Sequence, residues 1–314
     1  MSVRVAFVYA NPRGALASEV AEGRAPDTTL YGQNHLAELG FESRIYDPAL
    51  TRRRLPGPVA RGAWYLRELT LPLELRDADV VLSALAMLYP AAVRPLRRPR
   101  VVVLNFGLNL IYARAARARR GLLRGSLRSA AGVVCLGESQ RRTLLELTGL
   151  APERVHTALI GVDAGFFTPR PRRAGEPYVL TVGKDLARDY ATLAEAVRPL
   201  GVRCELVVHP RNLQGVELPP QACVREGLTW DELRELYADA ACVVVPQRRE
   251  RYRYGSEGGG LTALREAIER VLGDAALADS LGRAARADVE ARLTTGHAAE
   301  RLAPIFRAVA GEAS

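Results

Sequence analysis

Short apolar runs alternate with longer stretches of helical periodicity, and this alternation occurs in two successive series. In the first series we predict six strands: VRVAFVYA, SRIYD, DVVLSAL, RVVVLNF, GVVCLG and VHTALIG. Helical stretches such as TTLYGQNHLAELG and ESQRRTLLELTG lie between them. In the second series we predict four strands, PYVLTVG, RCELVVH, ACVRE and ACVVVPQ, and from Leu261 onward helix almost to the end. Strands that alternate with helices are typical of parallel sheets in an α/β protein.

The two series predict two domains, because 314 residues exceed the usual size of one domain. We expect an N-terminal Rossmann-like domain over residues 1–168, a linker rich in proline and arginine over 169–177, and a second Rossmann-like domain over 178–292. Residues 293–314 read as a helix that packs back on the first domain. The predicted fold class is α/β, with two Rossmann-like domains that face a cleft at the carboxyl ends of their strands.

The excess of positive charge lies in the first half of the chain. Residues 1–170 hold 24 arginines against 14 acidic residues, whereas residues 171–314 hold 20 basic against 21 acidic residues. Part of the excess recurs at helical spacing and predicts one stripe: Arg114, Arg117, Arg120, Arg124 and Arg128. Such a stripe attracts an anionic membrane surface. Nucleic acid is an unlikely partner, since no aromatic residues interleave to stack bases; a solvated helix face is the alternative.

The cysteines and the apolar runs indicate an intracellular setting. Cys135, Cys204, Cys223 and Cys242 are widely spaced and form no CxxC pair, which favours reduced core thiols over disulfides or a zinc site. The longest apolar run, Val80–Val93, is too short to cross a bilayer. No signal peptide pattern opens the chain. We therefore expect a cytoplasmic protein, peripheral at the inner membrane surface, that needs no metal and no cofactor.

The stretch TVGKDLARDYATL contains the only lysine of the chain, Lys184. A strand delivers Gly183 and Lys184 to the edge where open α/β sheets bind ligands, and a helix begins near Asp189. Arg188 lies in the connecting loop. A lysine and an arginine beside a helix start form a suitable clamp for a diphosphate, and the glycine permits close approach of the phosphates.

Longer segments resemble a known family. The segment GESQRRTLLELTGLAPERVHTALIGVDAGFF followed by PYVLTVGKDLARDYATLAEAV resembles the family 4 glycosyltransferases of GT-B fold. That family shows a GVD-x-x-F turn before its linker and a V-G-[RK] strand end after it. REGLTWDELRELYADAACVVVPQ is similar to the family's donor-site elements, and ALREAIERVLGDAALADSLGRAARADVEARLTT to its closing helices. The resemblance covers residues 130 to 310, while the first 130 residues match in strand order.

The resemblance implies a glycosyltransferase that uses a nucleotide diphosphate sugar with retention of configuration, in the synthesis of a cell-surface polysaccharide or glycolipid. Its paired basic residues, which stabilise the leaving diphosphate, match Lys184 and Arg188, and its glycine loop after the first strand places Gly14 near the donor phosphates. Asn105 and Asn109, at a strand end, are candidates for contact with a glycan or lipid-linked acceptor. No catalytic base can be named among the four histidines.

One region departs from the family pattern. The family has two glutamates eight positions apart, then two more strands and only afterwards its closing helices, whereas YGSEGGGLTALREAIERVLGD runs directly into those helices. Glu266 is the candidate ribose ligand, but neither register preserves the pair. We therefore predict a second sheet of about four strands with an incomplete donor pocket. A degenerate, non-catalytic binding protein and a nucleotide-sugar epimerase of the same fold remain the alternatives.

Overall fold

The computed structural model describes residues 2–9, 12–47, 68, 70–84, 89–93, 99–171, 173, 175–183, 188–248 and 261–311. Lys184 lies outside these residues. The described residues divide into two compact units. The first comprises the residues up to Asp163 together with those from Arg292 onward, and the second comprises the residues from Ala164 to Ala291.

The first unit is built on a six-stranded parallel sheet, and each of its strands overlaps one of the six predicted runs, although β2 begins two residues before its run. The strands are β1 (Val3–Val8), β2 (Phe41–Tyr46), β3 (Val80–Ala84), β4 (Arg100–Leu104), β5 (Gly132–Cys135) and β6 (Val155–Thr157). They pair in the order β2-β1-β3-β4-β5-β6. Because the order reverses at β1, the carboxyl ends of β1 and β3 form the topological switch point, where open sheets bind ligands.

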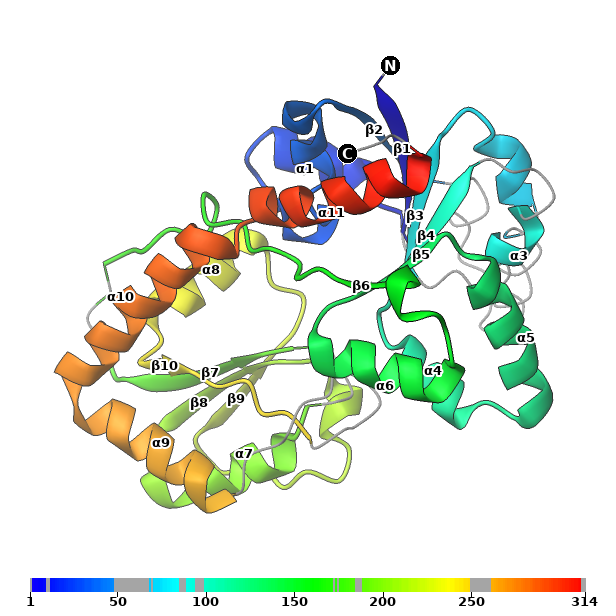
Figure 1. The fold of residues 1–314 in the computed structure, drawn as a ribbon. Coiled ribbons are helices and arrows are strands. Elements are labelled where there is room, and N and C mark those ends of the chain that lie inside the picture. Colours follow the sequence, from blue (N-terminus) through cyan, green and yellow to red (C-terminus); the bar gives the residue numbers. More distant parts are fainter. Residues whose placement is uncertain are drawn as a thin grey trace. The chain divides into compact units, whose positions relative to one another are not determined.

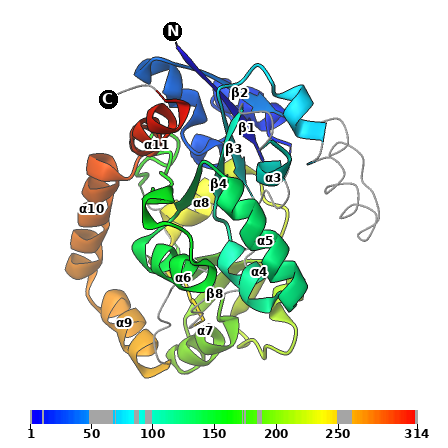
Figure 2. The ribbon, with the colours of Figure 1, turned by 45° about the vertical axis from the view of Figure 1, so that its right-hand side comes forward.

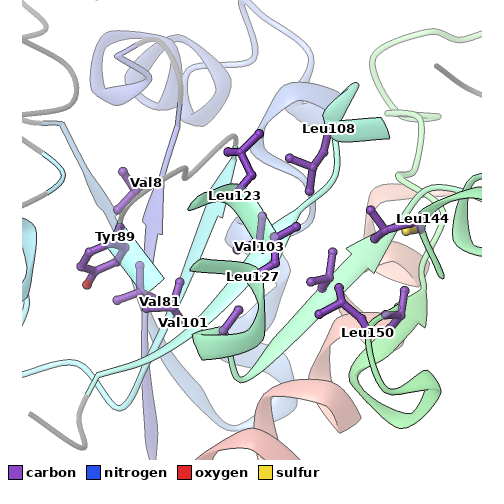
Figure 3. Packing of buried hydrophobic residues seen from close by; sticks show 14 of the residues in the cluster. Val8, Val81, Tyr89, Val101, Val103, Leu108, Leu123, Leu127, Leu144 and Leu150 are labelled. Atoms are coloured by element: carbon purple, nitrogen blue, oxygen red, sulfur yellow. The ribbon is translucent and has the colours of Figure 1, made fainter. Parts of the chain in front are cut away.

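Alternate residues of these strands fill two cores, one on each face of the sheet. Figure 3 shows the core that contains Val81, Val103 and Leu127, in which strand side chains meet those of the covering helices. The helices of the first unit include α1 (Gly14–Ala21), α3 (Tyr89–Val93), α4 (Leu108–Arg114), α5 (Arg117–Ser129), α6 (Glu138–Thr148) and α11 (Thr295–Ala310). The last, α11, lies against the other face beside β1 (Figure 1), where Phe306 is fully buried.

Two helical predictions of the first unit require correction. The arginine stripe is interrupted, because Ala115 and Ala116 both have extended backbone, with ψ of 145° and 155°. Arg114 therefore ends α4, and only the other four arginines of the predicted stripe lie on α5. The segment TTLYGQNHLAELG forms two 3₁₀ helices, η1 (Asp27–Leu30) and η2 (Gln33–Leu39), separated by the left-handed residues Tyr31 and Gly32.

The second unit contains a four-stranded parallel sheet, which confirms the predicted reduced sheet. Its strands are β7 (Tyr178–Val182), β8 (Arg203–Val207), β9 (Ala222–Arg225) and β10 (Cys242–Val243). They pair in the order β10-β7-β8-β9, so the switch point lies between β7 and β10. Among the described residues, no strand pairs with the outer side of β10, and Val243 and Val245 are 45% and 53% exposed.

Among its described residues, the second unit has four α-helices: α7 (Tyr190–Val197), α8 (Trp230–Asp239), α9 (Leu261–Gly273) and α10 (Ala275–Arg292, whose last residue already counts with the first unit). The short 3₁₀ helices η6 (Arg198–Leu200) and η7 (Pro210–Leu213) lie in its connections, and η5 (Pro152–Arg154) lies in a connection of the first unit. Thr229 and Glu232 form a capping box at the start of α8. Helix α9 packs beside α7 (Figure 2), and the chain is helical from Leu261 to Ala310 except for short turns.

Candidate functional site

Arg188 lies at the switch point of the second sheet. Gly183 directly follows β7, and its N–H donates to the carbonyl of Val207 on β8. Arg188 forms an isolated antiparallel bridge with Gln247, which follows β10, and the next N–H, that of Asp189, donates to the carbonyl of Pro246. The loop that begins with Gly183 is therefore tied to the carboxyl ends of both strands that flank the switch point.

Gly183 leaves the space that the side chain of Arg188 occupies. A β carbon at position 183 would lie 2.8 Å from Nε of Arg188 and 3.3 Å from the hydroxyl oxygen of Tyr190. That hydroxyl donates to the carbonyl of Gly183 at 2.7 Å, which fixes the strand end. The glycine thus allows the guanidinium to lie directly against the backbone at the sheet edge.

The guanidinium of Arg188 is not neutralised within the described part of the chain. Its Nη1 is buried and has no hydrogen-bond partner there. Asp189, the acidic neighbour, instead caps α7 by accepting the N–H of Thr192 at 3.2 Å. A buried donor without a partner is costly, so a ligand with acceptor oxygens would be favoured at this position.

The loop after β1 already holds an anion of the protein itself. The carboxylate of Asp47, which follows β2, accepts the N–H groups of Arg13 and Gly14 at the start of α1. A β carbon at Gly14 would lie 2.9 Å from a carboxylate oxygen of Asp47. The glycine has a local structural role here, and contact between Gly14 and donor phosphates stays a prediction.

The predicted acceptor residues Asn105 and Asn109 are fully buried. The amide of Asn105 donates to Oδ1 of Asn109 at 2.9 Å, and Asn109 donates to the carbonyl of Gln140. Oδ1 of Asn105 accepts the N–H of Leu108, which closes the turn after β4. These amides therefore hold a loop in place, and direct contact with an acceptor stays a prediction.

A row of aromatic rings at this edge was missed by the sequence analysis. The rings of Tyr9 and Tyr31 lie 5.5 Å apart, and those of Tyr31 and Phe106 lie 5.1 Å apart. Tyr31 has φ 57° and ψ 34°, and no other described residue besides glycine has positive φ. Such a conformation costs about 1–2 kcal/mol for a residue with a β carbon. The dipeptide Tyr-Gly in a polar stretch was the only available signal.

A buried carboxylate cluster fixes the loop that carries Tyr31. Asp27 accepts hydrogen bonds from Asn34, His35 and Thr295, the first residue of α11. Burial alone would raise the pKa of Asp27, but these hydrogen bonds outweigh burial and lower it, while the bond to Asp27 raises the pKa of His35. Asp163, of the GVD turn, accepts the N–H of Asp27. The GVD turn thus supports the loop after η1.

Glu266 lies on α9 and is exposed, whereas Ile268 of the same helix is buried. A single helix therefore occupies residues 261–273, and it packs on α7. The structure does not test a ribose contact by Glu266, which stays a prediction.

A cavity of about 490 Å³ in the second unit lies at the opposite end of β7, beside Tyr178. Its arginines are paired: Arg203 and Arg225 with the fully buried Glu205, and Arg173 with Asp239 and Glu235. Hydrogen bonds from Arg225 and Arg203 lower the pKa of Glu205 against the opposing effect of burial. The cavity is thus a paired ionic network and does not include Arg188.

The described residues contain no group of three or more His, Cys, Asp or Glu side chains arranged to hold a metal ion. Within the same part of the chain, no helix has the length and apolar character needed to cross a membrane.

Comparison with solved structures defines the class. The chain is similar to a sucrose-phosphate synthase from Thermosynechococcus elongatus, with a TM-score of 0.72, 16% identity, and coverage of 99% of this chain and 100% of that chain. It is similar to HepE from Anabaena, solved with UDP and glucose, with a TM-score of 0.66, 10% identity, and coverage of 97% and 99%. A putative UDP-N-acetylglucosamine 2-epimerase from Listeria monocytogenes gives a TM-score of 0.60, 11% identity, and coverage of 100% and 98%. The fold is therefore GT-B.

The family follows from the sequence. The family model described as Glycosyltransferase Family 4 matches residues 7–166, just over half of the chain. The chain belongs to this family. No curated protein sequence matches it significantly.

Proposed function

We propose that the protein transfers a sugar from a nucleotide diphosphate sugar to a glycan or lipid-linked acceptor. The observation that carries the proposal is the guanidinium of Arg188, which lies against Gly183 at the switch point of the second sheet and whose buried Nη1 has no hydrogen-bond partner among the described residues. Lys184, the only lysine of the chain, is adjacent to Gly183 in sequence. Both cations suit a diphosphate, and membership of the family supports the reaction class.

In this reaction the bond between the anomeric carbon of the sugar and the β-phosphate oxygen breaks, and its electron pair stays with the diphosphate. An acceptor hydroxyl forms the new bond to the anomeric carbon and loses its proton. Arg188 and Lys184 would stabilise the negative charge that develops on the departing diphosphate, an effect worth about 3–4 kcal/mol for a single well-placed donor. We expect retention of configuration, as the family resemblance implies.

We further propose that the protein associates with an anionic membrane through α5. Four arginines of the predicted stripe lie on this helix, and the helix contains no acidic residue. Arg117, Arg124 and Arg128 are exposed and have no ion-pair partner among the described residues. Each such charge contributes about 1 kcal/mol near anionic lipid. This surface would suit a lipid-linked acceptor in polysaccharide or glycolipid synthesis.

Two alternatives follow from specific observations. The reduced sheet with β10 at its edge favours a degenerate protein that binds nucleotide without turnover. The likeness to a putative UDP-N-acetylglucosamine 2-epimerase favours an epimerase of the same fold.

One incubation separates the three functions. UDP-glucose, UDP-N-acetylglucosamine, GDP-mannose and ADP-glucose are each incubated with the protein and a mixture of glycoside acceptors, and the products are followed by proton NMR. Transfer predicts a new anomeric signal together with free nucleoside diphosphate. Epimerisation predicts a changed sugar without dependence on acceptor. If a nucleotide sugar binds and neither product forms, the result would support the non-catalytic binding function and contradict the transferase function.

A further inference from the structure

We propose that Tyr31 and Phe106 form a stacking platform for a sugar ring of the acceptor on the first unit. The inference rests on the proposed function, because only a transferase requires an acceptor, and it specifies the chemistry by which that acceptor is held.

The two rings are in direct contact with each other. Their centroids are 5.1 Å apart with an interplanar angle of 36°, and the ring of Tyr9 contacts that of Tyr31 with centroids 5.5 Å apart. Tyr9 is only 4% exposed and its hydroxyl donates to the carbonyl of Leu30, whereas Tyr31 and Phe106 are half-buried. Aromatic faces are negative and attract the polarised C–H groups on the flat side of a sugar ring. Tyr9 therefore acts as the base of the platform and the other two rings as its surface.

The platform lies where this sheet is expected to bind a ligand. Tyr9 directly follows β1, one of the two strands at the switch point, and Phe106 follows β4 at the same carboxyl edge. Phe106 is positioned by its neighbours, because Asn105 is fixed in the buried amide network and Gly107 turns the chain with φ 84°. Asn105 and Asn109, which we predicted to contact the acceptor, thus hold the turn that carries Phe106.

The backbone of Tyr31 indicates that the ring itself is required. Glycine or asparagine would adopt its left-handed conformation at lower cost. The conformation is imposed from outside, since a β carbon on the adjacent Gly32 would lie 2.7 Å from the backbone nitrogen of Ala299 on α11. A bulky aromatic residue in an imposed, unfavourable conformation is typical of a ligand site.

Arg13 gives the platform a polar side. Burial raises the pKa of Tyr31, and the positive charge of Arg13 only partly opposes this shift. Nε of Arg13 is itself buried and has no hydrogen-bond partner among the described residues. A sugar ring matches this arrangement, because it combines an apolar face with hydroxyls at its edge. An alkyl chain would pack against the two rings, but it would remove water from the guanidinium of Arg13 without offering it a hydrogen-bond acceptor.

The test is saturation-transfer NMR on the full chain without donor. The probes are the methyl β-glycosides of glucose, galactose, mannose and N-acetylglucosamine, with octyl β-glucoside to separate ring from chain. Phe106→Leu keeps apolar bulk and removes the ring, Tyr31→Asn keeps the backbone conformation, and Tyr31→Phe keeps the ring. Phe167→Leu, a half-buried aromatic residue of the second unit, is the matched control.

We expect transfer to the sugar ring protons of at least one methyl glycoside. Phe106→Leu and Tyr31→Asn should lower this signal at least about fivefold, the equivalent of one aromatic contact, while Tyr31→Phe and Phe167→Leu retain it. Equal signals in all variants, no ring-proton signal in the native protein, or saturation confined to the octyl chain would each overturn the platform. Calorimetry with UDP, GDP and ADP on the same samples tests the proposed function separately, because the platform variants should bind nucleotide as the native chain does.

Discussion

Nε of Arg188 lies 2.8 Å from the point where a β carbon of residue 183 would be placed, so Gly183 and the guanidinium share one space at the end of β7. The Tyr190 hydroxyl, which donates a hydrogen bond to the carbonyl of Gly183, also borders this space. The position of the cation therefore depends on the absence of a side chain at residue 183.

Gly183→Ala should displace the guanidinium and weaken nucleoside diphosphate binding about tenfold, the loss expected for one charge-assisted hydrogen bond. Gly282→Ala is the matched control, since a β carbon at this position of α10 meets nothing within 4 Å. It should leave binding unchanged and raise the melting temperature slightly, because alanine is the better helix former. Calorimetry on both variants makes the comparison, and equal affinities would mean that Arg188 does not depend on Gly183.

The arginines of α5 should retain the protein on anionic membranes. Replacing Arg117, Arg124 and Arg128 with glutamine should reduce co-sedimentation with vesicles that contain phosphatidylserine, and added salt should release the native protein as the screening length falls below about 8 Å. Arg120 is left in place because it donates to the carbonyl of Ala113.

The control for this measurement removes the same charge elsewhere, by glutamine at Arg24, Arg142 and Arg283, which are all exposed. Equal loss of retention in both triple variants would show that net charge and not α5 is responsible. Retention on neutral vesicles at high salt would contradict an electrostatic contact.

The pair His35 and Asp27 should make stability depend on pH. The folded-state pKa of His35 lies above 6.5, so its contribution is complete below about pH 6.5 and is lost as the pH rises through the raised value. His35→Gln keeps a neutral hydrogen bond to Asp27. Its melting temperature should be about 2–4 °C below that of the native protein at pH 6, for roughly 1 kcal/mol, and the difference should narrow at pH 9. A difference that is the same at both values would contradict the charged pair.

The outer edge of β10, with which no described strand pairs, should favour self-association. Val245, which follows the edge strand, is 53% exposed, and unpaired edges bind further strands unless a charge blocks them. Val245→Lys should reduce the concentration-dependent growth of large species in light scattering without changing nucleotide affinity. An unchanged rate of growth would indicate that the described edge is not the contact.

The sequence predicted each of the ten strands that the structure describes, because most of them are short apolar runs bounded by polar or glycine residues. It predicted Gly183 at the end of a strand and Arg188 in the loop that follows, since the carboxyl edge of the sheet follows from strand order. It missed the platform because Tyr31 and Phe106 are 75 positions apart and meet only when the sheet forms. It placed Asn105 and Asn109 near the carboxyl end of β4, but it did not predict that both side chains are buried in a hydrogen-bond network. Partners such as the carbonyl of Gln140 are brought close only by tertiary packing.

The helical spacing of the arginines also did not predict the break between α4 and α5. Alanine favours helix, so Ala115 and Ala116 gave no stop signal. Ala115 is buried in the core of the first unit, and this packing overrides the local preference.

Calorimetric titration of the native chain, Arg188→Ala and Lys184→Ala with UDP, GDP and ADP, and with the matching nucleosides, tests the central claim most directly. The account predicts that one diphosphate binds the native chain, that each substitution weakens this binding by about tenfold to a hundredfold, and that affinity for the nucleoside scarcely changes. Arg198→Ala, an arginine of the same unit that bonds the carbonyl of Glu217, should behave as the native chain does. Equal diphosphate affinity in the native chain and both cation variants would contradict the assignment of the donor site.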